Sequence, residues 1–162
     1  MTPENNVSKI YRELFEKSVP AIAEGKVITD PLIDDPNDNM RGITILAKPS
    51  RSVCEKIAVF QNALRRTDQQ QYAQPSSDLH LTVLSLISCY TGFSLNDITI
   101  PDYVKIITDS IGENRPFTVR FRGITASKDA VMIQGFPEDD TLETVRERIR
   151  TNLKKSTLQH TL

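Results

Sequence analysis

The chain has 162 residues, of which 38% are hydrophobic and 25% are charged, as is typical of one soluble globular domain. Its 20 Lys and Arg residues nearly balance its 21 Asp and Glu residues, and the net charge of -1 argues against a bulk nucleic-acid-binding surface. The two cysteines, Cys54 and Cys89, are too few for a disulfide framework or a four-thiolate metal site, which favours a reducing, cytoplasmic setting.

Hydrophobic periodicity and turn residues divide the chain into helices, strands and loops. Apolar residues spaced three and four apart predict helices, short β-branched runs predict strands, and Gly and Pro predict the breaks between them. In chain order we expect a helix over 7–24, a loop over 25–40, a strand over 41–48, a helix over 50–66, a strand over 79–90, a helix over 101–111, a hairpin of strands over 117–122 and 130–134, and a last helix after residue 137. This order predicts an α+β domain.

We interpret residues 1–162 as a single domain. Residues 1–40 supply the first helix and an acidic loop, residues 41–156 form the core, and residues 157–162 are a C-terminal tail. The N-terminus begins with polar and acidic residues where an export signal would have basic ones, and no apolar run approaches the roughly 20 residues that span a bilayer. We therefore expect neither secretion nor contact with a membrane.

Two surfaces are predicted from the pattern of charged and apolar residues. Both faces of the strand 79–90 are largely apolar when its residues alternate, so we expect a central strand that is covered on both sides. The last helix has a run of charged residues that predicts a solvated face. It contains Arg146, Arg148, Arg150, Lys154 and Lys155, interspersed with Glu143 and Glu147.

His80 and Thr82 are the clearest candidates for chemistry. A period of two places the imidazole and the hydroxyl side by side on one strand face, so both can reach one phosphate or substrate oxygen. Imidazole groups exchange protons near neutral pH, and a hydroxyl can donate a hydrogen bond to a charged oxygen. The structural alternative is a histidine that is simply hydrogen-bonded within a sheet.

The residues around His80 resemble the His-x-Thr strand of the two-histidine phosphoesterase superfamily, which includes RNA-ligase-like cyclic phosphodiesterases. The similarity spans most of residues 40 to 155 and is greatest to a bacterial subgroup sometimes labelled mutarotase. The segments that resemble the family are RGITILA (41–47), DLHLTVLS (78–85), SCYTGF (88–93), GITAS (123–127) and QGFP (134–137).

The resemblance implies a bilobal α+β fold in which two His-x-Thr/Ser strands face each other across a cleft. One histidine would act as general base and the other as general acid on a phosphodiester, commonly a cyclic phosphate at an RNA end, without metal or other cofactor. His80 and Thr82 match the first motif. The implied partner is a phosphate-containing small molecule or an RNA end.

The second motif has no counterpart in the sequence. The other histidine, His160, is followed two residues later by Leu162 rather than by Thr or Ser, and we expect it at a frayed helix end. The family pattern would place the second motif on a further strand, so we expect a sheet that lacks this strand. Without the second histidine we expect little turnover by one chain. The sheet would also have an uncovered edge, which predicts self-association.

Weaker candidates lie elsewhere in the chain. Arg120 and Arg122 alternate with apolar residues in the strand 117–122, so either could bind phosphate, although a solvated sheet face explains them equally well. Gln134 could face the same cleft, and Tyr72 or Tyr90 could stack on a base. No His-x-x-x-His or Cys-x-x-Cys spacing predicts a metal site.

Three functions remain open from the sequence. The leading hypothesis is a phosphodiesterase-like domain that acts on, or binds, a cyclic phosphodiester through His80 and Thr82. The enzyme alternative is sugar mutarotation, which also needs an acid and a base but acts on a neutral hemiacetal. The third hypothesis is a phosphate- or nucleotide-binding module without catalysis.

Overall fold

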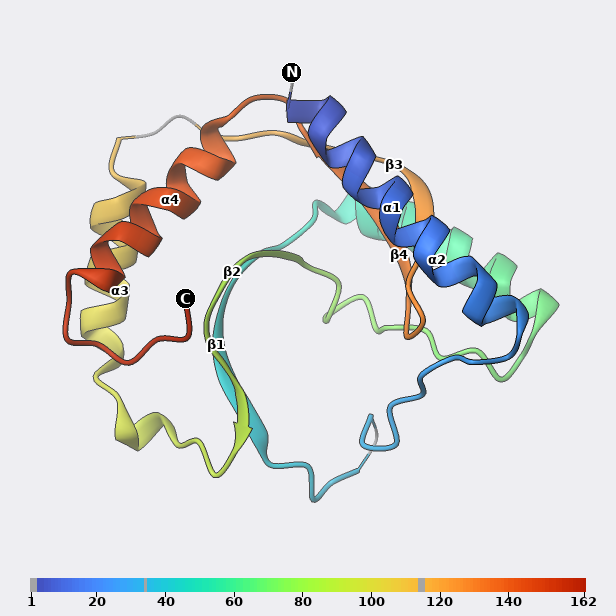
Figure 1. Cartoon of the computed structure of the whole chain (residues 1–162), viewed down its shortest axis with the longest axis horizontal. Coiled ribbons are helices and arrows are strands. Elements are labelled where there is room, and N and C mark those ends of the chain that lie inside the picture. Colours follow the sequence, from blue (N-terminus) through green and yellow to red (C-terminus); the bar gives the residue numbers. More distant parts are fainter. Residues whose placement is uncertain (1–2, 34, 114–115) are drawn as a thin grey trace.

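The computed structural model describes residues 3–33, 35–113 and 116–162 (Figure 1). Its helices and strands follow the predicted order, with a short 3-10 turn added, and the predicted α+β class is confirmed. The elements are α1 (Pro3–Ala23), β1 (Met40–Ala47), α2 (Arg51–Thr67), β2 (Leu81–Thr91), η1 (Leu95–Asp97), α3 (Ile100–Ile111), β3 (Val119–Ala126), β4 (Val131–Pro137) and α4 (Thr141–Lys154).

The first sheet contains only β1 and β2, paired antiparallel, among the described residues. The prediction of a central β2 with alternating faces is therefore wrong. The register between the strands shifts at three places, and at each place β2 supplies the extra residue, as in a β-bulge. Because each bulge changes which face a side chain occupies, the buried residues form adjacent pairs, Val83–Leu84 and Leu86–Ile87.

Gly42 allows the two strands to approach closely at the first bulge. A Cβ atom at this position would lie 2.4 Å from the carbonyl oxygen of Ile87 and 2.9 Å from the backbone nitrogen of Cys89. Both atoms belong to the backbone of β2, so they cannot turn aside as a flexible side chain can. The close pairing of β1 with β2 at this bulge therefore requires glycine.

The main core lies between the first sheet and the helices α3 and α4, which lie beside each other (Figure 1). Leu86 and Ile87 of β2 and Ile149 and Leu153 of α4 are completely buried. The apolar stripe predicted for the last helix therefore packs against β2, as a helix with apolar residues at spacings of three and four is expected to do.

The second sheet is the predicted hairpin, formed by β3 and β4 and covered by α1. The backbone nitrogen of Ser127 donates to the carbonyl of Ala130 at 2.8 Å, which closes the turn. Tyr11 of α1 accepts a hydrogen bond from the backbone nitrogen of Gly135 at 3.0 Å, and its ring lies edge-on to Phe136 with 5.7 Å between the ring centroids. These contacts fix α1 on the hairpin.

The elements surround an open ring in the view of Figure 1, with α3 and α4 on one side and α1, β3 and β4 on the other. The predicted apolar face of α2 is only half-buried, and no residue of this helix is fully buried. Across the described residues, no helix combines the length and apolar character that crossing a membrane requires.

Candidate functional site

His80 lies one residue before the start of β2 and is exposed to solvent. Its Nδ1 atom is 2.5 Å from the carbonyl oxygen of Asp78. A carbonyl oxygen can only accept a hydrogen bond, so this contact places the proton on Nδ1. In the neutral ring the lone pair is then on Nε2, which is the form that a general base needs.

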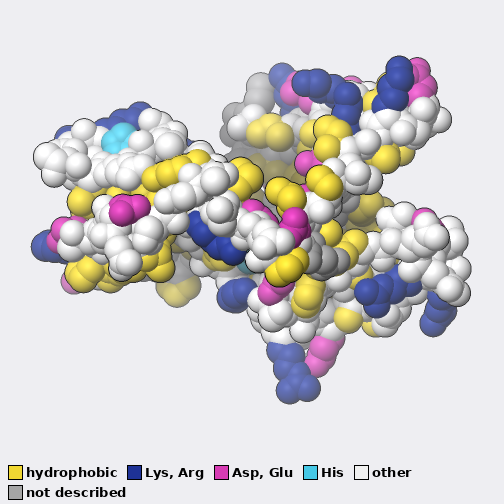
Figure 2. All heavy atoms as spheres, turned by 90° about the horizontal axis from the view of Figure 1, so that it is seen from below, with side chains coloured by type: hydrophobic (Ala, Val, Ile, Leu, Met, Phe, Trp, Pro, Cys, Tyr) yellow, Lys and Arg dark blue, Asp and Glu magenta, His cyan; other side chains and the backbone are white. Residues whose placement is uncertain are grey.

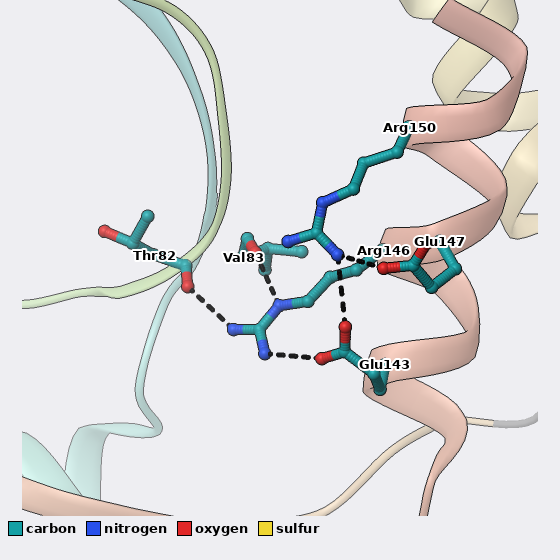
Figure 3. A network of polar contacts seen from close by, with 6 residues as sticks. All are labelled: Thr82, Val83, Glu143, Arg146, Glu147 and Arg150. Carbon is teal, nitrogen blue, oxygen red and sulfur yellow. Dashed lines mark hydrogen bonds and ion pairs between the residues drawn. The ribbon is translucent and has the colours of Figure 1, made fainter. Parts of the chain in front are cut away.

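Thr82 lies in β2, two residues beyond His80, with its side chain exposed. Figure 3 shows its hydroxyl directed away from α4, while its carbonyl oxygen points toward Arg146 and accepts a hydrogen bond from Nη2 at 3.3 Å. No hydrogen bond joins the hydroxyl to another described residue. The hydroxyl is therefore available to a ligand on the side of the sheet opposite α4.

Lys48 joins these two residues through the register of the first sheet. Leu46 pairs with Thr82 and Ala47 pairs with Leu81, which is the last pair of the ladder, and continuing this register by one residue would bring Lys48 opposite His80. The positions of Lys48 and His80 would then be two residues from the pair Leu46–Thr82, on the same face of the sheet. We name Lys48, His80 and Thr82 the β1–β2 site.

The loop before β2 orients both nitrogen groups of the β1–β2 site. The Lys48 ammonium donates to the carbonyl of Ser77 at 2.5 Å, next to the Asp78 carbonyl that holds His80. The loop is itself turned by a hydrogen bond from the backbone nitrogen of Asp78 to the carbonyl of Pro75 at 2.9 Å. Lys48 could not be assigned to the site from the sequence, because its only signal is the strand register.

The predicted arginines lie in the other sheet. Arg120 of β3 is paired with Glu138 at 2.6 Å, and Arg122 is paired with Glu4 of α1. The Arg122 guanidinium also lies 4.7 Å from the centroid of the Phe136 ring. Both charges are thus balanced by carboxylates, and no hydrogen bond or ion pair within the described ranges connects them to His80 or Thr82.

Gln134 and Tyr72 are also separate from the β1–β2 site. Gln134 of β4 donates from Nε2 to the carbonyl of Ile124 at 3.1 Å, across the bulge of the β3–β4 hairpin. Tyr72 lies in the loop between α2 and β2 with its side chain half exposed. Roles for these residues in substrate binding stay predictions, as do those of Arg120 and Arg122.

The tail after α4 does not fray. The backbone nitrogen of Thr161 donates to the carbonyl of Leu86 at 2.8 Å, and the backbone nitrogen of Ser88 donates to the Thr161 hydroxyl at 2.9 Å. The prediction of a frayed end around His160 is therefore wrong. Backbone groups of β2 form hydrogen bonds with Thr161 of the tail, on the edge where a neighbouring strand would pair.

The position of the tail separates the two histidines. Leu86 lies roughly 20 Å along β2 from His80 at the usual rise of about 3.3 Å per residue. His160 is next to Thr161, and its Nδ1 atom is buried without a hydrogen-bond partner among the described residues. At this position His160 does not form an acid–base pair with His80.

Four charged residues of α4 form a network that reaches the start of β2 through Arg146, from the side opposite the Thr82 hydroxyl (Figure 3). Arg146 donates from Nε to the carbonyl of Val83 at 2.7 Å, at the bulge where this residue is extra, and it also pairs with Glu143 at 3.2 Å. Arg150 pairs with both Glu143 and Glu147. The predicted solvated face of the last helix is thus wrong for Arg146, which links α4 to β2.

The network also changes proton affinities within it. Partial burial alone would raise the pKa of Glu143, but hydrogen bonds from Arg146 and Arg150 outweigh burial and lower the pKa below its ordinary value. Burial would lower the pKa of Arg150, and its hydrogen bonds to Glu147 and Glu143 raise it instead. Both shifts favour the charged forms of Glu143 and Arg150.

The described part of the chain contains no group of three or more His, Cys, Asp or Glu side chains that could hold a metal ion. A scan against protein-family models and searches of the curated proteins and of the solved structures each found no match. The resemblance to two-histidine phosphoesterases, with the bilobal arrangement that it implies, therefore stays a prediction from the sequence.

Proposed function

We propose that the β1–β2 site binds a phosphodiester, such as the cyclic phosphate of a nucleotide or RNA end, and that His80 acts as general base on it. The observation that supports this function best is the contact of His80 Nδ1 with the Asp78 carbonyl, because it occupies Nδ1 and leaves Nε2 of this exposed residue as the proton acceptor. The similarity of residues 78–85 to the His-x-Thr strand of phosphoesterases supports the same assignment.

Each residue of the site has a distinct role in this proposal. The Lys48 ammonium attracts the phosphate anion, and the Thr82 hydroxyl donates a hydrogen bond to a non-bridging oxygen. His80 accepts the proton of the attacking water as its oxygen bonds to phosphorus. The bond from phosphorus to the leaving oxygen then breaks, and this oxygen takes a proton from solvent.

Protonation of the leaving oxygen limits the rate in this scheme. A second histidine would normally protonate the leaving oxygen in the family that the sequence resembles, but His160 lies beside the far part of β2. We therefore expect ready binding of the phosphodiester and slow turnover. Mutarotation is disfavoured because a neutral sugar offers no charge to Lys48.

Isothermal titration with a 2′,3′-cyclic nucleotide, inorganic phosphate and an aldose tests the proposal. We expect the two phosphates to bind with an affinity that falls as salt is added, and the aldose not to bind. Lys48→Met should weaken binding about tenfold, whereas Lys17→Met on α1 should leave it unchanged. Aldose binding, or equal losses from the two lysine variants, would overturn the assignment.

Turnover of the cyclic nucleotide tests the role of His80. His80→Ala should remove hydrolysis while the far-UV circular dichroism stays the same, because the exposed ring is not part of the core. Thr82→Val should lower kcat/KM. The drop should correspond to a loss of transition-state stabilisation of about 1 to 3 kcal/mol, the value of one hydrogen bond to a charged oxygen. If His80→Ala binds but no form hydrolyses the nucleotide, the protein is a binding module and the catalytic part of the proposal fails.

A further inference from the structure

The outer edge of β1 is open. No backbone hydrogen bond from residues 41–47 reaches a described residue outside β2. In an antiparallel pair, every second residue directs its backbone N–H and C=O away from the partner, so this edge has a row of unpaired donors and acceptors. Residues 42–47 also contain no charged residue and no proline, the residue types that usually protect an exposed edge.

The opposite edge of the same sheet is closed. Arg146 binds the carbonyls of Thr82 and Val83, and Thr161 of the tail binds the backbone of Leu86 and Ser88. The sequence predicts an uncovered edge where a further strand is lacking, but the β2 edge is covered over these residues. Of the two edges of this sheet, β1 is therefore the one that can accept another strand.

An apolar pocket of about 280 Å³ lies alongside the open edge. Three consecutive residues of β1, Ile45, Leu46 and Ala47, line it, together with residues of β2, α3, α4 and the segment before β3. Among the described residues that line it, Thr141 is the one polar residue, so this lining favours aliphatic side chains. A strand added to β1 would bring such side chains to the pocket while its backbone pairs with the edge.

The accessible surface of the chain indicates how much surface is available for association. It measures 11,499 Å², about 40% more than a compact monomer of 18.3 kDa is expected to expose. The excess is larger than the roughly 800 Å² that each partner buries in a standard interface. Apolar side chains are visible among the exposed atoms in Figure 2, and Leu46 at the open edge is 43% exposed.

We infer that β1 pairs antiparallel with β1 of a second copy of this chain, about a two-fold axis. The two sheets then form one four-stranded sheet, and the apolar side chains of each β1 reach the pocket of the other copy. A second copy fits because β1 is itself an apolar strand without charges over residues 42–47, and because a two-fold axis satisfies both edges at once. This inference is independent of the proposed function.

Sedimentation equilibrium over a range of protein concentrations tests the pairing. We expect a monomer–dimer equilibrium whose dissociation constant rises at least tenfold in Leu46→Lys, because the lysine places a charge on the edge strand that has to pair with the second copy. Val59→Lys is the matched control, since Val59 is a 71% exposed apolar residue of α2, away from β1. A monomer at every concentration, or equal effects of the two substitutions, would overturn the inference.

Disulfide trapping tests the geometry even where Leu46→Lys unfolds the protein. In a Cys54→Ser, Cys89→Ser background, single cysteines are introduced as Ile43→Cys, Thr44→Cys, Ile45→Cys and Leu46→Cys. Residues opposed across an antiparallel pair have Cα atoms about 4.5 to 5.5 Å apart, within disulfide range. One position should link the two copies rapidly and its neighbours slowly, whereas absence of linking at all four positions would contradict the pairing.

Discussion

The two sheets differ in whether the basic side chains on them are paired with carboxylates. On β3, Arg120 and Arg122 are balanced by Glu138 and Glu4. At the β1–β2 site, Lys48 and His80 contact only neutral backbone carbonyls among the described residues. A cationic side chain in or beside a strand therefore indicates a ligand site only where the fold brings no carboxylate to it, and this condition is set by neighbours that are distant in sequence.

The largest difference between the two sheets is expected in the loss of unfolding free energy caused by replacing a glycine with alanine. Gly42→Ala should lower the free energy of unfolding by about 3 kcal/mol, because its Cβ would collide with backbone atoms of β2. Gly135→Ala should cost about 1 kcal/mol, since its Cβ would meet the side chains of Val119 and Phe121, which can shift. Urea denaturation measures both, and equal losses would show that the sheets are equally tight.

Loss of an arginine should also affect the sheets unequally. Arg146→Met removes hydrogen bonds to Val83 and Thr82 and should cost about 2 kcal/mol of unfolding free energy. Arg122→Met removes a solvent-exposed ion pair and should cost less than about 1 kcal/mol. If chemical denaturation shows the reverse order, Arg146 does not support the start of β2.

Acid should weaken the link between α4 and β2. The pKa of Glu143 is lower in the folded state than in the unfolded state, so its charge stabilises the fold above the ordinary glutamate pKa of about 4.3 and this contribution is lost as pH falls. The urea midpoints of the wild type and Glu143→Gln should therefore differ at pH 7, and the difference should shrink as the pH falls below the ordinary glutamate pKa. A constant difference would show that the carboxylate charge is not responsible.

The smallest effect is expected at the exposed pair in the second sheet. Glu138→Gln removes the partner of Arg120 and should cost about 0.5 kcal/mol or less, because both side chains are largely exposed. The same change frees the Arg120 charge. Phosphate binding by this variant should equal that of the wild type when the β1–β2 site is the binding site, and tighter binding would give Arg120 a role.

The sequence predicted the elements because their signals are local. The β-branched run before Lys48 and the apolar stripe of α4 identify a strand and a helix wherever they pack. The burial pattern of β2 could not be predicted, because strict alternation holds only in a regular strand and the bulges depend on pairing with β1.

The candidate site was predictable only in part for the same reason. His80 and Thr82 are neighbours in sequence, so a period of two is enough to associate them. Lys48 joins them through strand register, and Arg120 and Arg122 are balanced by carboxylates of β4's end and of α1. Pairings between distant segments follow from tertiary packing, which local sequence patterns do not predict.

Backbone amide spectra recorded during titration with a 2′,3′-cyclic nucleotide test the central claim most directly. If the β1–β2 site binds the phosphodiester, the amide signals of Lys48, His80 and Thr82 shift with one dissociation constant, those of Arg120 and Arg122 stay in place, and His80→Ala weakens the response. Shifts confined to β3 and β4, or unchanged binding by His80→Ala, would contradict the account.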